Sequence, residues 1–509
     1  MTEPRNLTEA VEVRTPADRL LEATLPEARA HREGDERLVH RLLEEDPTAA
    51  QANIWVASAT GEVEAVRGFI EEDASSANAR GGTRHWEPLL YLCFSRLLRT
   101  DPSRASAMVE IAKLLLERGA DPNVYWIDSG EATGAKETPV YGAAGVANNV
   151  ELARLLIDAG ADPNDGETPY HMVEHDGVPC ADFVFPKLVD PHRGTALGHK
   201  LDYDDLPGLR KMLELGGDPD GPTPFHYYPI HSAVWRGRSK PFFDLLLEHG
   251  ADVNLPNKEG RSAYAMAARA GKTEIMGWLV EAGASTELSE PDAFIAACAA
   301  GDADGARSLL ASQPDLFDEF GDRERGEICE AAAAGNLDGV RTMLDLGWDI
   351  DTRNGVWAET AVHRAALHGN LDLVKLLAER GADLTLTDRS YHSTPLGWAQ
   401  HGEAHEVIEY FRSLPDRLDI WDAIELGQTE RALALLPGVD VNAGMRGASA
   451  GVLLRLASGH GNLTLVTALL ENGADPVVRT PYGANAIDVA RERGHHEIAS
   501  LLERHGKAR

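Results

Sequence analysis

The segment at residues 171–175, HMVEH, holds the side chains best suited to chemistry in this sequence. It follows the H-x-x-E-H pattern, in which two histidines one helical turn apart bind zinc and the glutamate acts as a base. Cys180 or His192 could supply a third ligand. A zinc-dependent hydrolase centred on His171, Glu174 and His175 is therefore one hypothesis for this chain.

Other candidates for chemistry are weak. The sequence contains no G-x-x-x-x-G-K-[S/T] phosphate loop and no dinucleotide-binding glycine pattern. Its cysteines form no short paired motif and have no evident catalytic partner: Cys93, Cys180, Cys298 and Cys329. The leading expectation is thus a protein that is not an enzyme, with no catalytic residues, no metal site and no cofactor.

Composition narrows the class of partner. The chain has 82 acidic and 49 basic residues, a net charge of −33, which argues against binding to nucleic acid or anionic membranes. One functional interpretation is an acidic surface for a basic protein partner. Another is an inhibitor that imitates nucleic acid through its carboxylates. The charge could also serve only to keep an elongated surface soluble.

The expected compartment follows from what the sequence lacks. The N-terminal segment has no apolar core of a leader peptide, and no run of 18 apolar residues occurs anywhere. Four unpaired cysteines fit a reducing environment. We expect a cytoplasmic protein, and the excess of Arg over Lys with abundant Ala points to a bacterial gene.

The elements that would position any site are repeated pairs of short helices. Residues 360–384 read TAVHRAALHGNLDLVKLLAERGADL, with a narrow apolar stripe in the first helix and a broader one in the second. Gly369 and Gly381 can end the two helices in a left-handed conformation. Twenty-five residues cannot bury both stripes alone, so the unit requires copies on either side.

Glycines between paired helices give the period. They lie 34, 30, 34, 34, 33, 25, 34 and 33 residues apart, at Gly237, Gly271, Gly301, Gly335, Gly369, Gly402, Gly427, Gly461 and Gly494. The two short steps fall near residues 284–292 and 413–420, between one unit's second helix and the next unit's first. A third shortened junction is expected near 180–193, where Pro186 and Pro191 would interrupt a regular second helix. The stack should continue across all three.

The period, the Thr-Pro openings and the Gly-Ala-Asp-Pro-Asn closings resemble ankyrin repeats over residues 37–507. The resemblance implies an all-α solenoid of about fourteen helix pairs, with first helices on a concave side and β-turn fingers between units, several of them shortened. It also implies a structural role for His171, because His231 and His363 occupy the same repeat position. Gly397 and Asp488 replace that histidine.

The chain divides by the same pattern into four segments. Residues 1–35 form a polar arm, 36–289 a first stack of repeats, 290–413 a second stack, and 414–509 repeats with a C-terminal cap. The finger at residues 123–136 is the longest and contains the glycine- and serine-bearing stretch NVYWIDSGEATGAK.

Aromatic residues precede many first helices, where the fingers belong. Fingers are expected to expose them, and Trp and Tyr are favoured anchors of protein interfaces. The partner-binding candidates are Trp86, Tyr125, Trp126, Tyr227, Tyr228, Trp357, Tyr391 and His392. The alternative is that these rings pack on the adjacent finger. The leading hypothesis is therefore a scaffold that binds a protein partner, with a basic one as an option, on its concave acidic face. The sequence leaves the oligomeric state open.

Overall fold

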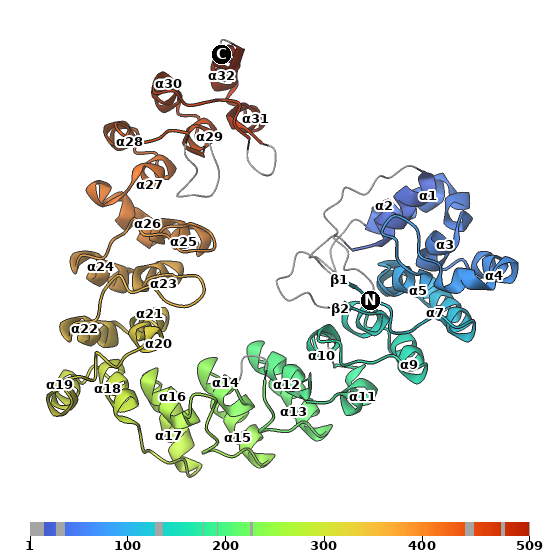
Figure 1. Ribbon diagram of the computed structural model, residues 1–509, viewed down its shortest axis with the longest axis horizontal. Helices are drawn as coiled ribbons and strands as arrows, with labels where there is room; N and C mark the ends of the chain where they lie inside the picture. The colour runs from blue at the N-terminus through green and yellow to red at the C-terminus, as the bar shows by residue number, and fades with distance from the viewer. Residues whose placement is uncertain are drawn as a thin grey trace. The chain divides into compact units, whose positions relative to one another are not determined.

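A computed structural model describes residues 15–26, 36–127, 136–175, 177–190, 192–223, 227–442, 452–479 and 484–507. Over these ranges the chain folds into short helices stacked side by side, which confirms the expected all-α repeat solenoid (Figure 1). The only sheet in the described residues consists of two strands of two residues each, in which β1 (Trp126–Ile127) pairs antiparallel with β2 (Lys136–Glu137).

The chain divides into two compact units. Unit 1 comprises Met1–Met266 and Glu274–Ser285, and unit 2 comprises Ala267–Thr273 and Thr286–Arg509. Unit 1 begins with α1 (Pro16–Thr24), α2 (Glu36–Glu45) and η1 (Pro47–Gln51). Its helix pairs then follow: α3 (Ile54–Thr60) with α4 (Val63–Glu72) and η2 (Ala74–Asn78); α5 (Pro88–Cys93) and α6 (Leu97–Thr100) with α7 (Pro102–Glu117); α8 (Pro139–Tyr141) and η3 (Gly142–Val146) with α9 (Val150–Asp158); α10 (Glu167–His171) with α11 (Ala181–Val184) and η4 (Phe185–Lys187); α12 (His192–Asp202) with α13 (Leu206–Glu214); and α14 (Pro229–Trp235) with α15 (Lys240–Glu248).

Helices α16 (Ala263–Arg269) and α17 (Thr273–Glu281) come where the two units follow each other along the chain. The pairs of unit 2 are α18 (Glu290–Ala299) with α19 (Ala303–Ser312); α20 (Asp322–Arg325) and α21 (Glu327–Ala333) with α22 (Leu337–Asp345); α23 (Ala361–Leu367) with α24 (Leu371–Glu379); α25 (Pro395–His401) with α26 (His405–Arg412) and η5 (Pro415–Arg417); α27 (Ile420–Glu425) with α28 (Thr429–Leu435); α29 (Val452–Gly459) with α30 (Leu463–Glu471); and α31 (Ala486–Glu492) with α32 (His496–Lys507).

Packing follows the sequence period. First helices contact first helices, as in α21, α23 and α25, and second helices contact second helices, as in α22, α24 and α26. Helix α23 buries Val362 and Ala365 on its narrow stripe, and α24 buries Leu373 and Leu377 on its broader one. Burying each such leucine contributes about 2 kcal/mol relative to exposure, which only neighbouring pairs can provide.

The helix joints are mostly as expected, with one exception. Gly369 has a φ of +66°, which lets the chain turn from α23 into α24. Gly402 instead keeps a φ of −80°, and Glu403 takes the left-handed conformation with a φ of +53°. A Cβ on Gly402 would overlap the carbonyl oxygen of Leu367. This glycine therefore allows close packing of α25 on α23 and does not supply the turn.

Asparagines at the ends of several repeats link each repeat to the next one. Asn123 donates through Nδ2 to the Gly160 carbonyl at 3.0 Å and accepts at Oδ1 from the Asp162 amide at 2.8 Å. Asn442 makes the same pair of bonds with Gly473 and Asp475. A repeated asparagine thus satisfies the backbone groups at the end of the next second helix.

The three shortened junctions differ in their local structure. At 284–292, Asn254 still accepts from the Ser285 amide at 2.7 Å, and the chain then enters α18 directly from its N-cap, Ser289. At 413–420, Arg417 bridges instead, donating to the carbonyls of Ala378 at 3.1 Å and Ala382 at 2.6 Å. At 180–193 the second helix shortens to α11 followed by the 3-10 turn η4, which contains Pro186.

Helix α1 forms within the segment expected to be a polar arm. Its Leu20 and Leu21 are fully buried, and it contacts α2 and α3. A capping box between Thr15 and Asp18 fixes its start.

All four cysteines are buried and unpaired. Burial raises the pKa of the Cys180 thiol to about 11 and that of Cys298 to about 12, and it also raises the pKa values of Cys93 and Cys329. None of the helices in the described ranges combines the length and the apolar composition of a membrane span.

Candidate binding site

Two of the aromatic candidates are buried, contrary to the expectation that finger rings are exposed. Trp86 and Trp126 are 2% and 5% exposed and stack on each other, with ring centroids 5.0 Å apart. Phe94 packs against both rings, at 6.0 Å and 5.8 Å. These two tryptophans form a small apolar core between successive fingers of unit 1, so they do not present a surface to a partner.

The neighbouring Tyr125 is 37% exposed, and Lys136 Nζ lies 4.8 Å from its ring centroid. Residues 128–135 of the long finger lie outside the described residues. Tyr227 and Tyr228 are half-buried; Tyr227 stacks on Trp235 at 6.2 Å and Tyr228 lies 5.7 Å from His231. None of these three rings is among the lining residues of the aromatic-lined pocket described next.

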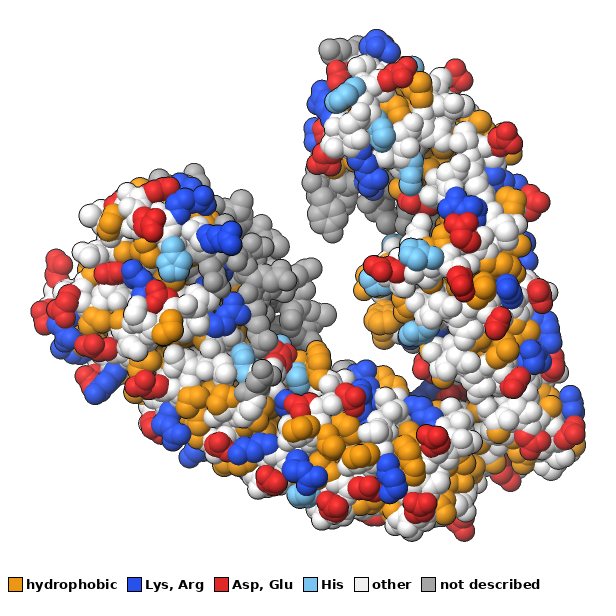
Figure 2. Space-filling view, turned by 180° about the vertical axis from the view of Figure 1, so that it is seen from behind, with side chains coloured by type: hydrophobic (Ala, Val, Ile, Leu, Met, Phe, Trp, Pro, Cys, Tyr) orange, Lys and Arg blue, Asp and Glu red, His pale blue; other side chains and the backbone are white. Residues whose placement is uncertain are grey.

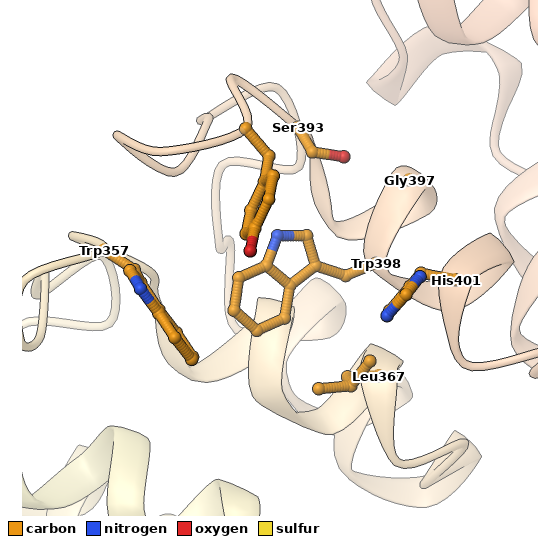
Figure 3. Close-up of a pocket in the computed structure, with 7 residues that line it drawn as sticks. Trp357, Leu367, Ser393, Gly397, Trp398 and His401 are labelled. Atoms are coloured by element: carbon orange, nitrogen blue, oxygen red, sulfur yellow. The ribbon is translucent and has the colours of Figure 1, made fainter. Parts of the chain in front are cut away.

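The structure brings Trp357 and Tyr391 together. They lie on two successive fingers of unit 2, at residues 352–360 and 385–393, and are 41% and 68% exposed. With α23 and α25 they enclose a pocket of about 380 Å³ (Figure 3), referred to below as the aromatic pocket. Its lining residues are Trp357, Leu367, Tyr391, Ser393, Gly397, Trp398 and His401. His392 is half-buried with a φ of +50° and lies outside this lining.

Trp398 forms the inner wall. Figure 3 shows its indole between Trp357 on one side and Leu367 and His401 on the other. The Trp357 and Trp398 rings meet edge to face, with centroids 6.3 Å apart and an interplanar angle of 67°. Trp398 is almost fully buried, and His363 of α23 packs edge-on against it at 5.5 Å.

Asp388 organises the 385–393 finger. One carboxylate oxygen accepts from the amides of Ser390 at 2.8 Å and Tyr391 at 2.6 Å. The other accepts from the Ser393 amide at 2.9 Å and from Trp398 Nε1 at 3.1 Å. One buried carboxylate therefore holds both the Trp398 indole and the backbone of Tyr391. Burial opposes its ionisation, but these four donors hold the pKa of Asp388 below its usual range.

His363 and Gly397 occupy the same repeat position in α23 and α25 but have different roles. The buried His363 donates from Nε2 to the Ser393 carbonyl at 3.1 Å, while Nδ1 accepts from Thr360. Burial lowers the pKa of His363 to about 4, which keeps the ring neutral. A Cβ on Gly397 would overlap Ser393 Oγ, so a side chain there would require the Ser393 hydroxyl at the mouth of the pocket to rotate away.

The proposed zinc ligands do not share a helix. Helix α10 ends at His171, so the predicted one-turn spacing to His175 is wrong. His175 Nε2 lies 2.7 Å from the Gly145 carbonyl, whereas His171 pairs with Glu174 at 2.9 Å and Glu167 at 3.2 Å. Burial disfavours the imidazolium, but these two carboxylates raise the pKa of His171 to about 9. Zinc ligation needs the neutral ring.

No group of three or more His, Cys, Asp or Glu side chains in the described part of the chain is arranged to hold a metal ion. Residues 447–451 read GASAG, which has the spacing of a nucleophile motif and is not among the candidates named from the sequence. They lie outside the described residues.

Trp398 is not among the candidates named from the sequence, because it lies within a helical pattern that gives no sign of a pocket. The signal that could have found it was the adjacent Gly397, which leaves the usual histidine position empty.

Comparison with models of protein families identifies ankyrin repeats in this chain. The match is described as three copies and covers residues 230–319 and 328–419. The second range contains the whole lining of the aromatic pocket.

Proposed function

Because this chain is an ankyrin-repeat protein, we propose that it binds a protein partner and that the aromatic pocket of unit 2 is the centre of the contact. One observation carries the proposal: Trp357 and Tyr391, from successive fingers, expose large rings around a pocket whose inner wall is held rigid. Tryptophan and tyrosine are the residues most enriched at interface hot spots, and rings fixed in advance lose little entropy on binding.

The partner that we propose is basic and is bound on the concave, finger-lined side. Support comes from the net charge of −33, which steers a basic partner over distances beyond direct contact. Figure 2 shows acidic and basic side chains interspersed over its visible face, a pattern that does not favour imitation of nucleic acid by regular rows of carboxylates. Binding would need no chemistry from this chain, and we place it in the cytoplasm, where four unpaired cysteines are stable.

The test compares partner binding by the full chain with that by single variants. A partner recovered by affinity capture from the native cytoplasm would be purified and its Kd measured for wild type, Trp357→Ala and Tyr391→Ala. Each variant is expected to weaken binding by about 30-fold, the effect of losing a hot-spot ring worth about 2 kcal/mol. Tyr203→Ala is the matched control, because Tyr203 is similarly exposed but lies in unit 1.

Two results would overturn parts of the proposal. If Trp357→Ala and Tyr391→Ala both bind as tightly as wild type, the aromatic pocket is not the contact. If the Kd is the same in 50 mM and 300 mM salt, the partner does not bind through opposite charge, since exposed charges are screened over about 10 Å at such concentrations.

A further inference from the structure

The walls of the aromatic pocket are rich in π-electron density and carry no Lys or Arg side chain. Three of its lining residues are Trp357, Tyr391 and Trp398, and among the rest His401 has the one side chain that can carry a positive charge. Indole and phenol rings present a negative face, and cations within about 6 Å of such rings are attracted to them.

The buried groups behind these walls add negative charge. Asp388 is ionised, and the donors bonded to its carboxylate are neutral: three backbone amides and the Trp398 indole. His363, which packs against the same indole, is kept neutral by burial. The inner wall therefore lies against one negative charge whose hydrogen-bond donors are all neutral.

Two arginines beside the pocket already have acceptors. Arg364 lies over Trp357, 5.7 Å from its centroid, and pairs with the buried Glu359 at 2.5 Å. Arg353 donates to the carbonyls of Ala358 at 3.0 Å and Thr387 at 2.7 Å. Neither side chain lines the pocket.

The cation that already lies over Trp357, Arg364, is a guanidinium. A guanidinium is planar, stacks on aromatic faces and is more weakly hydrated than an ammonium, so it loses less solvation in a narrow pocket. The volume of about 380 Å³ is large enough to admit such a side chain with its aliphatic stem.

Resting on the proposed function, we infer that the aromatic pocket receives an arginine side chain of the partner. The guanidinium would lie between the Trp357 and Tyr391 rings and above the Trp398 indole, with its charge balanced by Asp388.

The test uses blocked amino acids on the full-length protein labelled with 5-fluorotryptophan. Nα-acetyl-arginine N-methylamide is titrated alongside its citrulline and leucine counterparts, and the fluorine signals of Trp357 and Trp398 are followed by NMR. These signals are assigned with Trp357→Phe and Trp398→Phe. The arginine probe is expected to shift both signals with a Kd at least about 5-fold lower than that of citrulline, which has the same shape without the charge. Tyr391→Ala should weaken arginine binding by about 5- to 30-fold and Tyr203→Ala should leave it unchanged.

The outcomes separate this inference from the proposed function. Equal binding of the citrulline or leucine probe would show a pocket for uncharged groups and overturn the inference. A lack of any shift with arginine would also overturn it, while loss of the partner in Trp357→Ala would still support the proposed contact. Conversely, arginine binding together with an unaffected partner Kd would refute the proposed contact and leave a pocket that binds guanidinium.

Discussion

At the scale of single residues, the residue type at the third position of a first helix depends on the finger that follows that repeat. His231 and His363 each reach a backbone carbonyl of the next finger, at Arg261 and Ser393, both at 3.1 Å. Gly397 precedes the shortened junction at 413–420, where the chain turns through η5. The imidazole occurs where a finger supplies its acceptor, so its absence at Gly397 fits the missing finger.

Asp422 reaches back to α25 beside that junction and should make stability depend on pH. It is 5% exposed, accepts from the Thr394 hydroxyl at 2.8 Å, and has its pKa raised by burial to about 7. Because the unfolded carboxyl has a pKa of about 3.9, the folded state holds an extra proton between these values. Its contribution to stability is therefore complete below pH 4 and is lost as the pH rises through 7.

Asp422→Asn removes the charge and keeps an oxygen for Thr394. The variant is expected to be more stable than wild type at pH 8, by up to about 4 kcal/mol, with a difference that shrinks toward pH 5. Urea unfolding at both pH values measures this. A difference that is the same at pH 5 and pH 8 would show that Asp422 does not titrate in this range.

Trp126→Ala tests the assignment of the buried tryptophan pair to the core. Losing a buried indole should cost about 3–5 kcal/mol of unfolding free energy. Tyr125→Ala, one residue earlier and exposed, should change it by less than about 1 kcal/mol. Chemical denaturation compares the unfolding free energies of the two variants. A Trp126→Ala protein that is as stable as wild type but no longer binds the partner would show that Trp126 is a partner-binding residue.

At the scale of elements, a buried ion network joins residues that come before and after the shortened junction at 284–292. Arg269, 6% exposed, donates to Asp292 at 2.7 Å and also contacts Glu327. The network ties the C-terminal end of α16 to the first turns of α18 and α21. It stabilises neighbouring first helices at a place where no finger is available.

Arg269→Ala should be strongly destabilising, because it leaves two carboxylates without their cation in a poorly solvated place. The expected cost is about 3–5 kcal/mol. Arg341→Ala removes an exposed pair with Asp338 and should cost less than about 1 kcal/mol. Denaturant unfolding of both variants measures the two costs. A similarly small loss of unfolding free energy in both would mean that the Arg269 network contributes little to stability.

Local pattern was sufficient to predict much of the fold. The glycine period located the helix joints, because the left-handed conformation at most of them favours glycine, and the short steps located the shortened junctions. The Trp86–Trp126 stack was not predictable, since its partners are 40 residues apart and their contact depends on how two fingers lean together. The aromatic pocket was found in part: the exposed Trp357 and Tyr391 were named, but Trp398 needed the spatial position of Asp388.

At the scale of the whole molecule, stability is a sum over neighbours. Among the described residues, helix pairs contact mainly the pairs next to them, so different parts of the chain can unfold separately. We expect the fluorotryptophan signals of Trp86 in unit 1 and Trp398 in unit 2 to disappear at different urea concentrations. A single transition at both positions would instead indicate cooperativity over the whole array.

The burial of every native cysteine has a practical consequence. Thiols with raised pKa values and no solvent access react slowly with maleimides, so the wild-type chain is close to inert toward them. Tyr391→Cys would then be modified almost alone, without removing any natural cysteine. One dye at the pocket rim and another at Tyr203→Cys would report, by energy transfer, how far apart the two units are in solution.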